Sequence, residues 1–168
     1  MKKTLIVVDM QNDFIDGSLG TKEAIAIVPN VQKKIEEYQK RGDEIVFTRD
    51  THSEDYLQTS EGKKLPVAHC IMGSHGWNIA EGLEVPNGKY IDKSNFGWTH
   101  WNDNAFEEVE MVGLCTDICV VSNALILKAM FPDANITVDA SCCAGVTPET
   151  HKAALETMKM CQINVIGE

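Results

Sequence analysis

Short apolar runs rich in β-branched residues alternate with amphipathic segments along the chain. Residues 4–9, 44–50, 110–114, 135–140 and 163–167 form five such runs, and residues 89–92 form a weaker one. Continuous apolar runs of this length are typical of strands whose two faces are both covered. The pattern therefore predicts six strands in a mainly parallel sheet.

Helical periodicity separates these runs. Residues 28–42 carry apolar side chains on one face and charges on the other, and residues 117–130 form a second helix after the fourth strand. Residues 147–160 open with Thr147 as N-cap and Pro148 at the first helical position. The alternation predicts an α/β fold of three layers, α/β/α, in which ligands bind beyond the carboxyl ends of the strands.

No linker, repeat or low-complexity tract divides the chain, so we expect one domain over residues 1–168. A content of 43% hydrophobic residues is typical of a globular protein. Residues 51–88 show little periodicity and form a long loop region. Loops of this length in a compact domain are often functional.

The charge and the cysteines restrict the partners and the compartment. A net charge of −10 argues against nucleic acid and anionic membrane surfaces as partners. Asp9 ends the first apolar run too early for a signal peptide, and no apolar stretch is long enough to span a bilayer. The six cysteines lack the dense spacing of a secreted disulfide scaffold. We therefore expect a reduced, cytoplasmic protein, and the sequence allows a homo-oligomer.

Chemically versatile side chains follow four of the predicted strands. Asp9 ends the first strand, Asp50 ends the second, and Lys93 follows the third. Cys115 and Cys119 follow the fourth. Because the carboxyl ends of parallel strands meet at one edge of a sheet, these residues are expected to converge there.

The two thiols of the segment VGLCTDICVV are not equivalent. Thr116 is a suitable N-cap, which would place Cys119 in the first helical turn, where the helix dipole favours a thiolate. Cys115 precedes the cap and can offer a backbone N–H. Cys119 is therefore the better nucleophile. The alternatives are that both are small buried hydrophobic residues, or that they form a redox pair, for which the spacing is unusual.

Asp9 and Lys93 each have an ordinary interpretation, as a turn residue and as a solvated surface lysine. Beside a thiol, the two residues could instead form a catalytic group. The ammonium group favours the thiolate form of the cysteine and anchors the carboxylate, and the carboxylate can transfer protons. The sequence thus predicts a catalytic group of Asp9, Lys93 and Cys119.

A second cluster of polar residues lies in and beside the long loop region. Asp50 and His52 are two residues apart, so their side chains share one face of an extended segment. Glu61 and His69 follow in the same region. Two imidazoles with carboxylates suit a divalent transition metal such as Zn²⁺, Mn²⁺ or Fe²⁺. The remaining three histidines are expected to be solvated.

Six segments together resemble the nicotinamidase branch of the isochorismatase-like cysteine hydrolases. They are LIVVDMQNDF, FTRDTH, HCIMGSHG, DKSNF, GLCTDICV and DASCCAGVTPETHKAAL, in that order along nearly the whole chain. The resemblance implies a six-stranded parallel sheet, with Asp9, Lys93 and Cys119 as catalytic residues. It also implies a metal site at Asp50, His52, Glu61 and His69, and Phe14 beside the substrate. A cis peptide before Cys115 would bring its N–H, with that of Cys119, into an oxyanion hole.

The implied reaction is the hydrolysis of nicotinamide to nicotinate and ammonia through a thioester, as in NAD salvage. Two departures concern the substrate. Many nicotinamidases carry a further histidine shortly after the D-x-H segment, where HSEDYLQTSE has none, and Glu61 would be the substitute ligand, as in some members. Many also carry an aromatic residue just before the metal histidine, where this chain has LPVAH. Trp77, Trp98 or Trp101 could supply the missing ring. The alternatives are a related hydrolase acting on another small amide or ureido compound, and a non-catalytic metal-binding protein with this fold.

Overall fold

A parallel sheet of six strands forms the centre of the molecule. The computed structural model describes residues 3–101 and 106–168, and its strands lie in the order β3-β2-β1-β4-β5-β6. In chain order the strands are β1 (Thr4–Val8), β2 (Glu44–Asp50), β3 (Lys89–Lys93), β4 (Glu108–Leu114), β5 (Asn135–Ala144) and β6 (Asn164–Ile166). All neighbouring pairs are parallel, as predicted.

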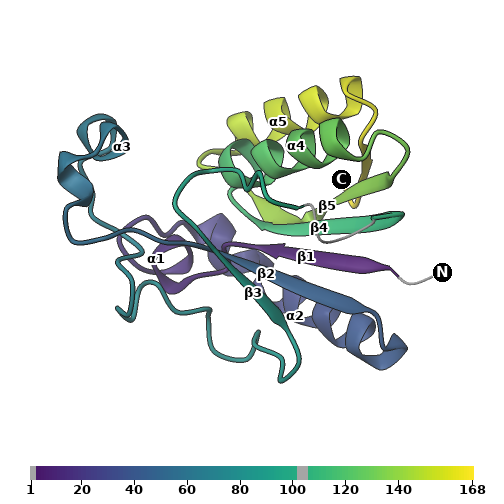
Figure 1. Ribbon diagram of the computed structural model, residues 1–168, viewed down its shortest axis with the longest axis horizontal. Coiled ribbons are helices and arrows are strands. Elements are labelled where there is room, and N and C mark those ends of the chain that lie inside the picture. Colours follow the sequence, from purple (N-terminus) through teal and green to yellow (C-terminus); the bar gives the residue numbers. More distant parts are fainter. Residues whose placement is uncertain (1–2, 102–105) are drawn as a thin grey trace.

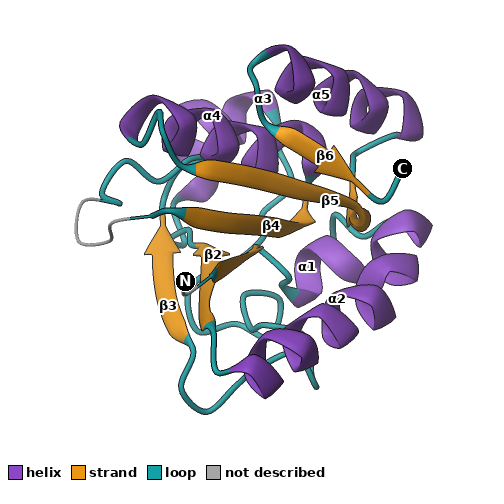
Figure 2. Ribbon diagram, turned by 90° about the vertical axis from the view of Figure 1, so that its right-hand side faces the viewer, coloured by secondary structure: helices purple, strands orange, loops and turns teal. Residues whose placement is uncertain are grey.

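Helices cover both faces of this sheet (Figure 2). Helices α1 (Asn12–Ile15) and α2 (Lys22–Arg41) lie on one face, and α4 (Val121–Met130) and α5 (Pro148–Met160) lie on the other, while the short helix α3 (Ser60–Lys64) belongs to the loop region. One core cluster joins alternate strand residues such as Leu5 and Val7 to α1 and α2. Another joins Ile6 and Val8 to α4 and α5. The period of two along β1 thus divides its side chains between two cores, which gives the predicted three layers.

The helices differ from the prediction mainly where they begin. Helix α2 starts at Lys22, well before residue 28, because the Thr21 side chain accepts a hydrogen bond from the Ala24 N–H and Pro29 is tolerated inside the helix. Residues 51–88 contain the short helix α3, which projects from the body (Figure 1). Within residues 3–101 and 106–168, no helix is long and apolar enough to cross a membrane.

The helix after β4 starts differently from the prediction. Cys115, not Thr116, is the N-cap, and residues Thr116–Val120 form a π-helical turn before α4. The Thr116 hydroxyl instead lies 2.6 Å from Nδ1 of His151 on α5, so it does not cap the helix. Cys119 nevertheless lies in the first turn, as expected.

The strand order reverses between β1 and β4, and this is where open α/β sheets bind ligands. Val8 pairs with Gly113 at the carboxyl ends of these two strands. Gly113 has φ of +122°, and a Cβ there would lie 2.1 Å from the Val8 carbonyl oxygen. Glycine therefore lets β4 approach β1 closely just before Cys115.

Candidate active site

Asp9, Lys93 and Cys119 meet at this edge although they come from three separate segments. Lys93 Nζ lies 2.6 Å from Asp9 Oδ2 and 3.4 Å from Cys119 Sγ. The three residues are 0%, 1% and 4% exposed, in chain order. Thr48 on β2 donates its hydroxyl to Asp9 Oδ1 at 2.7 Å and so fixes the carboxylate. The sequence therefore predicted the right three side chains to be neighbours.

Opposite charges hold this buried group together. Burial acts to lower the pKa of Lys93, but the negative charges of Asp9 and Asp50 raise it by more, so the net shift of the pKa is upward. Burial raises the pKa of Asp9, and the adjacent ammonium of Lys93 opposes that shift. The lysine is thus a permanent cation, and Asp9 is a carboxylate with an increased affinity for a proton.

The protonation state of Cys119 differs from the prediction. Burial raises its pKa well above the usual value, and the charge of Asp9 raises it further, whereas Lys93 lowers it. The first-turn position and the lysine therefore do not make the thiolate the resting form, because both are outweighed by burial in the closed site. The neutral thiol is the resting form, and its proton must leave when the sulfur reacts.

Cys115 lies at the cavity edge, before the π-helical turn. The Leu114–Cys115 peptide bond is cis, as the resemblance implied. Burial raises the pKa of the Cys115 thiol to about 12. Its side chain is therefore a neutral thiol, which agrees with a contribution through its backbone and not through its sulfur.

The four predicted metal ligands form one cluster. One potential ligand atom from each of Asp50, His52, Glu61 and His69 lies within 4.8 Å of the others. His52 Nε2 lies 2.9 Å from Asp50 Oδ2 and 3.7 Å from Glu61 Oε1. His69 Nε2 lies 3.5 Å and 3.8 Å from the same two oxygens. Ligand atoms around a tetrahedral zinc ion are separated by roughly 3.3 Å, so small adjustments would suffice.

The hydrogen bonds around these side chains also suit a metal. The ring of His69 pairs its Nδ1 with the Val67 carbonyl at 2.7 Å, which leaves Nε2 free to act as a ligand. Asp50 Oδ2 faces the two histidines, while its Oδ1 lies 3.7 Å from Lys93 Nζ. Burial and the nearby Asp50 raise the pKa of Glu61. A divalent cation between the two carboxylates would relieve their repulsion.

Gln11 is a supporting residue that sequence reasoning missed. Its side-chain oxygen accepts the Asp50 N–H at 2.7 Å, and its amide nitrogen donates to the Asp50 carbonyl at 2.8 Å. The same nitrogen donates to the Trp77 carbonyl at 2.9 Å. Gln11 is fully buried and ties β2 to the loop region. A polar residue two positions after a buried strand was the available signal.

An apolar cavity of about 240 Å³ opens onto the nucleophile and the metal ligands. Phe14, Leu19, Leu65, Phe96, Ile118 and Val146 form its walls, with Asp50, Glu61, His69, Cys115 and Cys119 at the polar end. Phe14, which the resemblance implies lies beside the substrate, lines this cavity with its ring centroid 5.5 Å from that of His69. Phe96 is a second aromatic wall that sequence reasoning did not identify.

None of the three tryptophans lines this cavity. Trp77 lies under Arg49, whose guanidinium carbon is 3.9 Å from the ring centroid, and its Nε1 donates to Thr51. Trp98 packs against His100. Trp101 is buried against Phe106 in the core cluster that contains α4 and α5. The suggestion that a tryptophan supplies the missing ring is therefore wrong for this arrangement.

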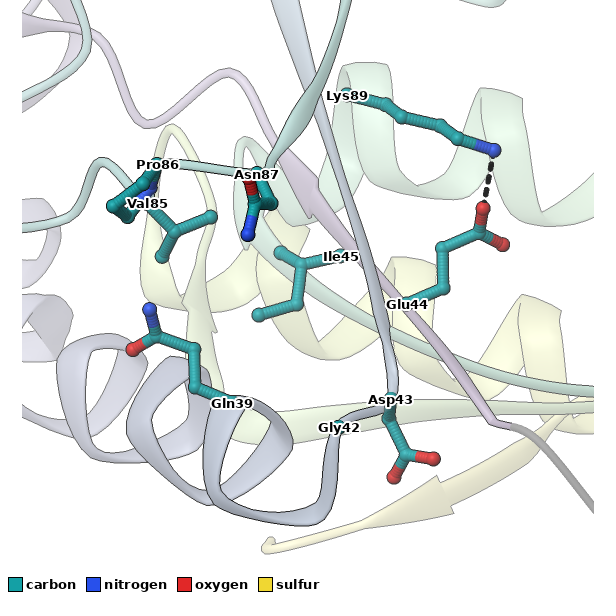
Figure 3. Close-up of a pocket in the computed structure, with 9 residues that line it drawn as sticks. All are labelled: Gln39, Gly42, Asp43, Glu44, Ile45, Val85, Pro86, Asn87 and Lys89. Carbon is teal, nitrogen blue, oxygen red and sulfur yellow. Dashed lines mark hydrogen bonds and ion pairs between the residues drawn. The ribbon is translucent and has the colours of Figure 1, made fainter.

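Another hollow, of about 410 Å³, lies at the opposite edge of the sheet (Figure 3). Its lining comes from the end of α2, the start of β2 and the turn before β3. Lys89 and Glu44 pair across its rim. Its lining holds no thiol and no histidine, so it offers neither the nucleophile nor the ligands found at the carboxyl edge.

Comparisons with known proteins agree with this geometry. A family profile described as the isochorismatase domain matches residues 3–167. The isochorismatase family protein PncA of Bacillus subtilis is 28% identical over 173 aligned positions, which cover 92% of this chain and 93% of that protein. The nicotinamidase/pyrazinamidase of Mycobacterium tuberculosis is 25% identical over 185 positions, covering 98% of both.

A solved structure with a similar fold is the pyrazinamidase of Pyrococcus horikoshii in complex with zinc. It superposes with a TM-score of 0.87 at 27% identity, and the match covers 100% of both chains. Its α/β architecture agrees with the six-stranded parallel sheet described above. Because the family profile spans nearly the whole sequence, the chain belongs to the isochorismatase family.

Proposed function

We propose that this protein is a metal-containing cysteine amidohydrolase whose substrate is nicotinamide, with pyrazinamide as a second substrate. The observation that carries the proposal is the buried group of Asp9, Lys93 and Cys119 at one end of an apolar cavity. The relatives named above as nicotinamidase and pyrazinamidase support the choice of amide. We propose further that residues 1–168 act as one domain in the cytoplasm.

In the first half-reaction, Cys119 Sγ attacks the amide carbonyl while Asp9 takes the thiol proton. This order follows from the raised pKa of the thiol, since a neutral nucleophile needs a base at the moment of attack. Asp9 has an increased proton affinity, and Lys93 keeps it oriented. The N–H groups of Cys115 and Cys119 stabilise the tetrahedral oxyanion.

Breakdown of the tetrahedral intermediate completes the first half-reaction: the protonated Asp9 gives its proton to the leaving nitrogen, the C–N bond breaks, and ammonia departs from a thioester on Cys119. In the second half-reaction, Asp9 takes a proton from water, whose oxygen attacks the thioester carbonyl. The C–S bond then breaks, the proton returns to the sulfur, and nicotinic acid leaves and ionises to nicotinate in solution. Asp9 thus moves protons in both halves, while Lys93 retains its charge.

Asp50, His52, Glu61 and His69 are the residues that would hold the metal ion. A divalent metal ion held there would supply a Lewis acid for an electron-pair donor of the substrate, such as a ring nitrogen. The donor set of imidazole and carboxylate groups suits Zn²⁺, Mn²⁺ or Fe²⁺. Phe14 and Phe96 would then enclose the ring between apolar walls. A cavity of about 240 Å³ favours a small ligand over a peptide or nucleotide.

An ammonia-release assay with a substrate panel tests this proposal. The panel contains nicotinamide, pyrazinamide, two aliphatic amides and an N-carbamoyl compound, each with the parent protein and with Cys119→Ala. We expect release from the two aromatic amides that disappears in Cys119→Ala. Hydrolysis of the aliphatic or carbamoyl compounds alone would favour a related hydrolase with another substrate. Absence of release from every compound would favour a non-catalytic metal-binding protein.

A further inference from the structure

A buried asparagine joins the nucleophile to the segment that carries Phe96. Asn123 is 0% exposed and lies on α4, four residues after Cys119. Its Nδ2 donates to the Cys119 carbonyl at 2.9 Å and to the Phe96 carbonyl at 3.2 Å. Its Oδ1 accepts the Trp98 N–H at 2.9 Å. One side-chain amide therefore binds the backbone on both sides of the cavity.

Position 123 lies in a buried apolar part of a helix, which disfavours asparagine unless its side chain is fully hydrogen-bonded. Asparagine has a low helix propensity, and its neighbours Ala124 and Leu127 on α4 are fully buried apolar residues. A buried amide without hydrogen-bond partners strongly destabilises the folded state, so the three hydrogen bonds of Asn123 offset the cost of burying its side chain. An apolar residue here would fit the helix better, but it would remove the side-chain hydrogen bonds to the Phe96 carbonyl and the Trp98 N–H.

Residues 94–98 lie directly against α4, following β3 (Figure 1). A Cβ at Gly97 would lie 2.4 Å from Cδ1 of Ile126, so the two segments are in close contact. At the start of the same segment, the Asn95 carbonyl accepts a hydrogen bond from Lys93 Nζ at 3.1 Å. The segment thus links the catalytic cation to the Phe96 wall, and Asn123 fixes it against the nucleophile.

We propose that Asn123 is a positioning residue that sets the spacing between Cys119 and the Phe96 wall, and so the preference of the cavity for ring-bearing ligands. The inference rests on the proposed use of Cys119 as nucleophile and deepens it by naming a determinant of substrate class. Asn123 touches no substrate. It acts by holding the backbone of Phe96. The side chain of Phe96 lines the cavity and is 45% exposed.

Asn123→Asp separates the positioning effect from the effect of side-chain size. Aspartate has nearly the same shape and can still accept the Trp98 N–H. Even when burial keeps the new carboxyl protonated, it has one hydrogen to donate where the amide donates two, so one of the carbonyls of Cys119 and Phe96 loses its donor. The segment carrying Phe96 should therefore move away from the nucleophile, while Lys93 and Asp9 keep their mutual ion pair. Asn123→Ser is a milder second variant that leaves room for a water molecule.

The measurement compares two alkylating reagents that share one reactive group, iodoacetamide and N-phenyl-2-iodoacetamide. Second-order rate constants at Cys119 are obtained by peptide mapping, which excludes the exposed Cys161. We expect the parent to react about fivefold or more faster with the phenyl reagent, and Asn123→Asp and Asn123→Ser to lose most of that ratio. Phe96→Ala should lose it equally, and Asn123→Asp should add nothing in a Phe96→Ala background.

The ratio reports a property that a merely structural role would not change. Loss of stability alone would alter both rate constants together and leave the ratio at the parent value. Asn30→Asp is the matched control, because Asn30 Nδ2 donates one hydrogen bond to the Ser141 carbonyl away from the cavity. A parent ratio near one, an unchanged ratio in both Asn123 variants, or additive effects in the double variant would each overturn the inference.

Failure of the proposed function is distinguishable from failure of this inference. Alkylation requires no hydrolysis, so a changed ratio would stand even if the parent released no ammonia from nicotinamide. Conversely, nicotinamide hydrolysis by the parent with an unchanged ratio in Asn123→Asp would leave the function intact and remove Asn123 from it.

Discussion

Replacing Lys93 with methionine removes the cation from the buried ion pair and leaves a side chain of similar length. Lys93 and Asp9 are 1% and 0% exposed, and their charged atoms are 2.6 Å apart. Without the ammonium, burial and the charge of Asp50 raise the pKa of Asp9 further. The folded variant then keeps a proton on Asp9 that the unfolded chain, with a carboxyl pKa of about 3.9, has released.

The free energy of binding this extra proton determines how the stability of Lys93→Met depends on pH. Loss of one partner of a buried ion pair typically costs about 3–5 kcal/mol. Between the unfolded-state pKa and the folded-state pKa of Asp9, each pH unit changes the free energy of unfolding by about 1.4 kcal/mol. The folded state binds the extra proton, so the stability of Lys93→Met falls as pH rises from about 4 towards the folded-state pKa of Asp9.

Urea denaturation of the parent and Lys93→Met at pH 5 and pH 7 measures this difference, and ammonia release measures activity. We expect activity to fall by orders of magnitude, because protonated Asp9 cannot accept the thiol proton. The double variant with Asp9→Asn should lose the added pH dependence of stability.

Lys34→Met is the matched control for Lys93→Met. Lys34 pairs with Glu110 at 2.6 Å and Asp139 at 2.9 Å, outside the cavity. This variant should be less stable than the parent but keep its activity per folded molecule. A stability loss in Lys93→Met that is equal at pH 5 and pH 7, together with near-parent activity, would refute the assignment of Lys93 to the catalytic group.

Three further predictions address the metal site, the pH profile and a distant hydrogen bond. His69→Ala should lose most of about one divalent metal ion per chain, measured by elemental analysis, while the exposed His100→Ala should retain it. Because burial raises the pKa of Asp9 above 3.8, kcat/KM should fall with acid along a limb that lies above pH 4; a limb below pH 4 would exclude Asp9 as the base. Tyr38→Phe should lower the free energy of unfolding by about 1.5–3 kcal/mol in urea without changing activity, because the Tyr38 hydroxyl donates to the Glu110 carboxylate. An unchanged stability would mean that solvent replaces this bond.

The four central strands β1, β2, β4 and β5 were predictable because each is a mainly buried apolar run, a property of consecutive residues. The edge strands β3 and β6 are largely exposed and gave a weaker signal. Helix starts were less predictable. Thr147 caps α5 as predicted, since its hydroxyl accepts the Thr150 N–H within the same turn. Thr116 has the same local signal after β4, but a contact with His151 on another helix takes its hydroxyl. Competition from a distant residue is invisible in the local sequence.

The site was predictable to the extent that topology alone assembles it. Parallel strands bring Asp9, Lys93 and Cys119 to one edge, and the sequence shows which residues end each strand. The protonation state of the thiol depends on burial by the whole cavity, so it could not be inferred from the helix position. Phe96 and Asn123 likewise acquire their roles only through contacts across the fold.

The central claim is that Cys119 forms a covalent thioester with the acyl part of an amide. Rapid acid quenching of the parent protein during nicotinamide turnover, followed by peptide mapping, tests it directly. We predict a nicotinoyl group on the peptide that contains both cysteines, present in Cys115→Ala and absent in Cys119→Ala, whose ammonia release is also lost. A nicotinoyl group that persists in Cys119→Ala, or turnover by that variant at the parent rate, would contradict the account.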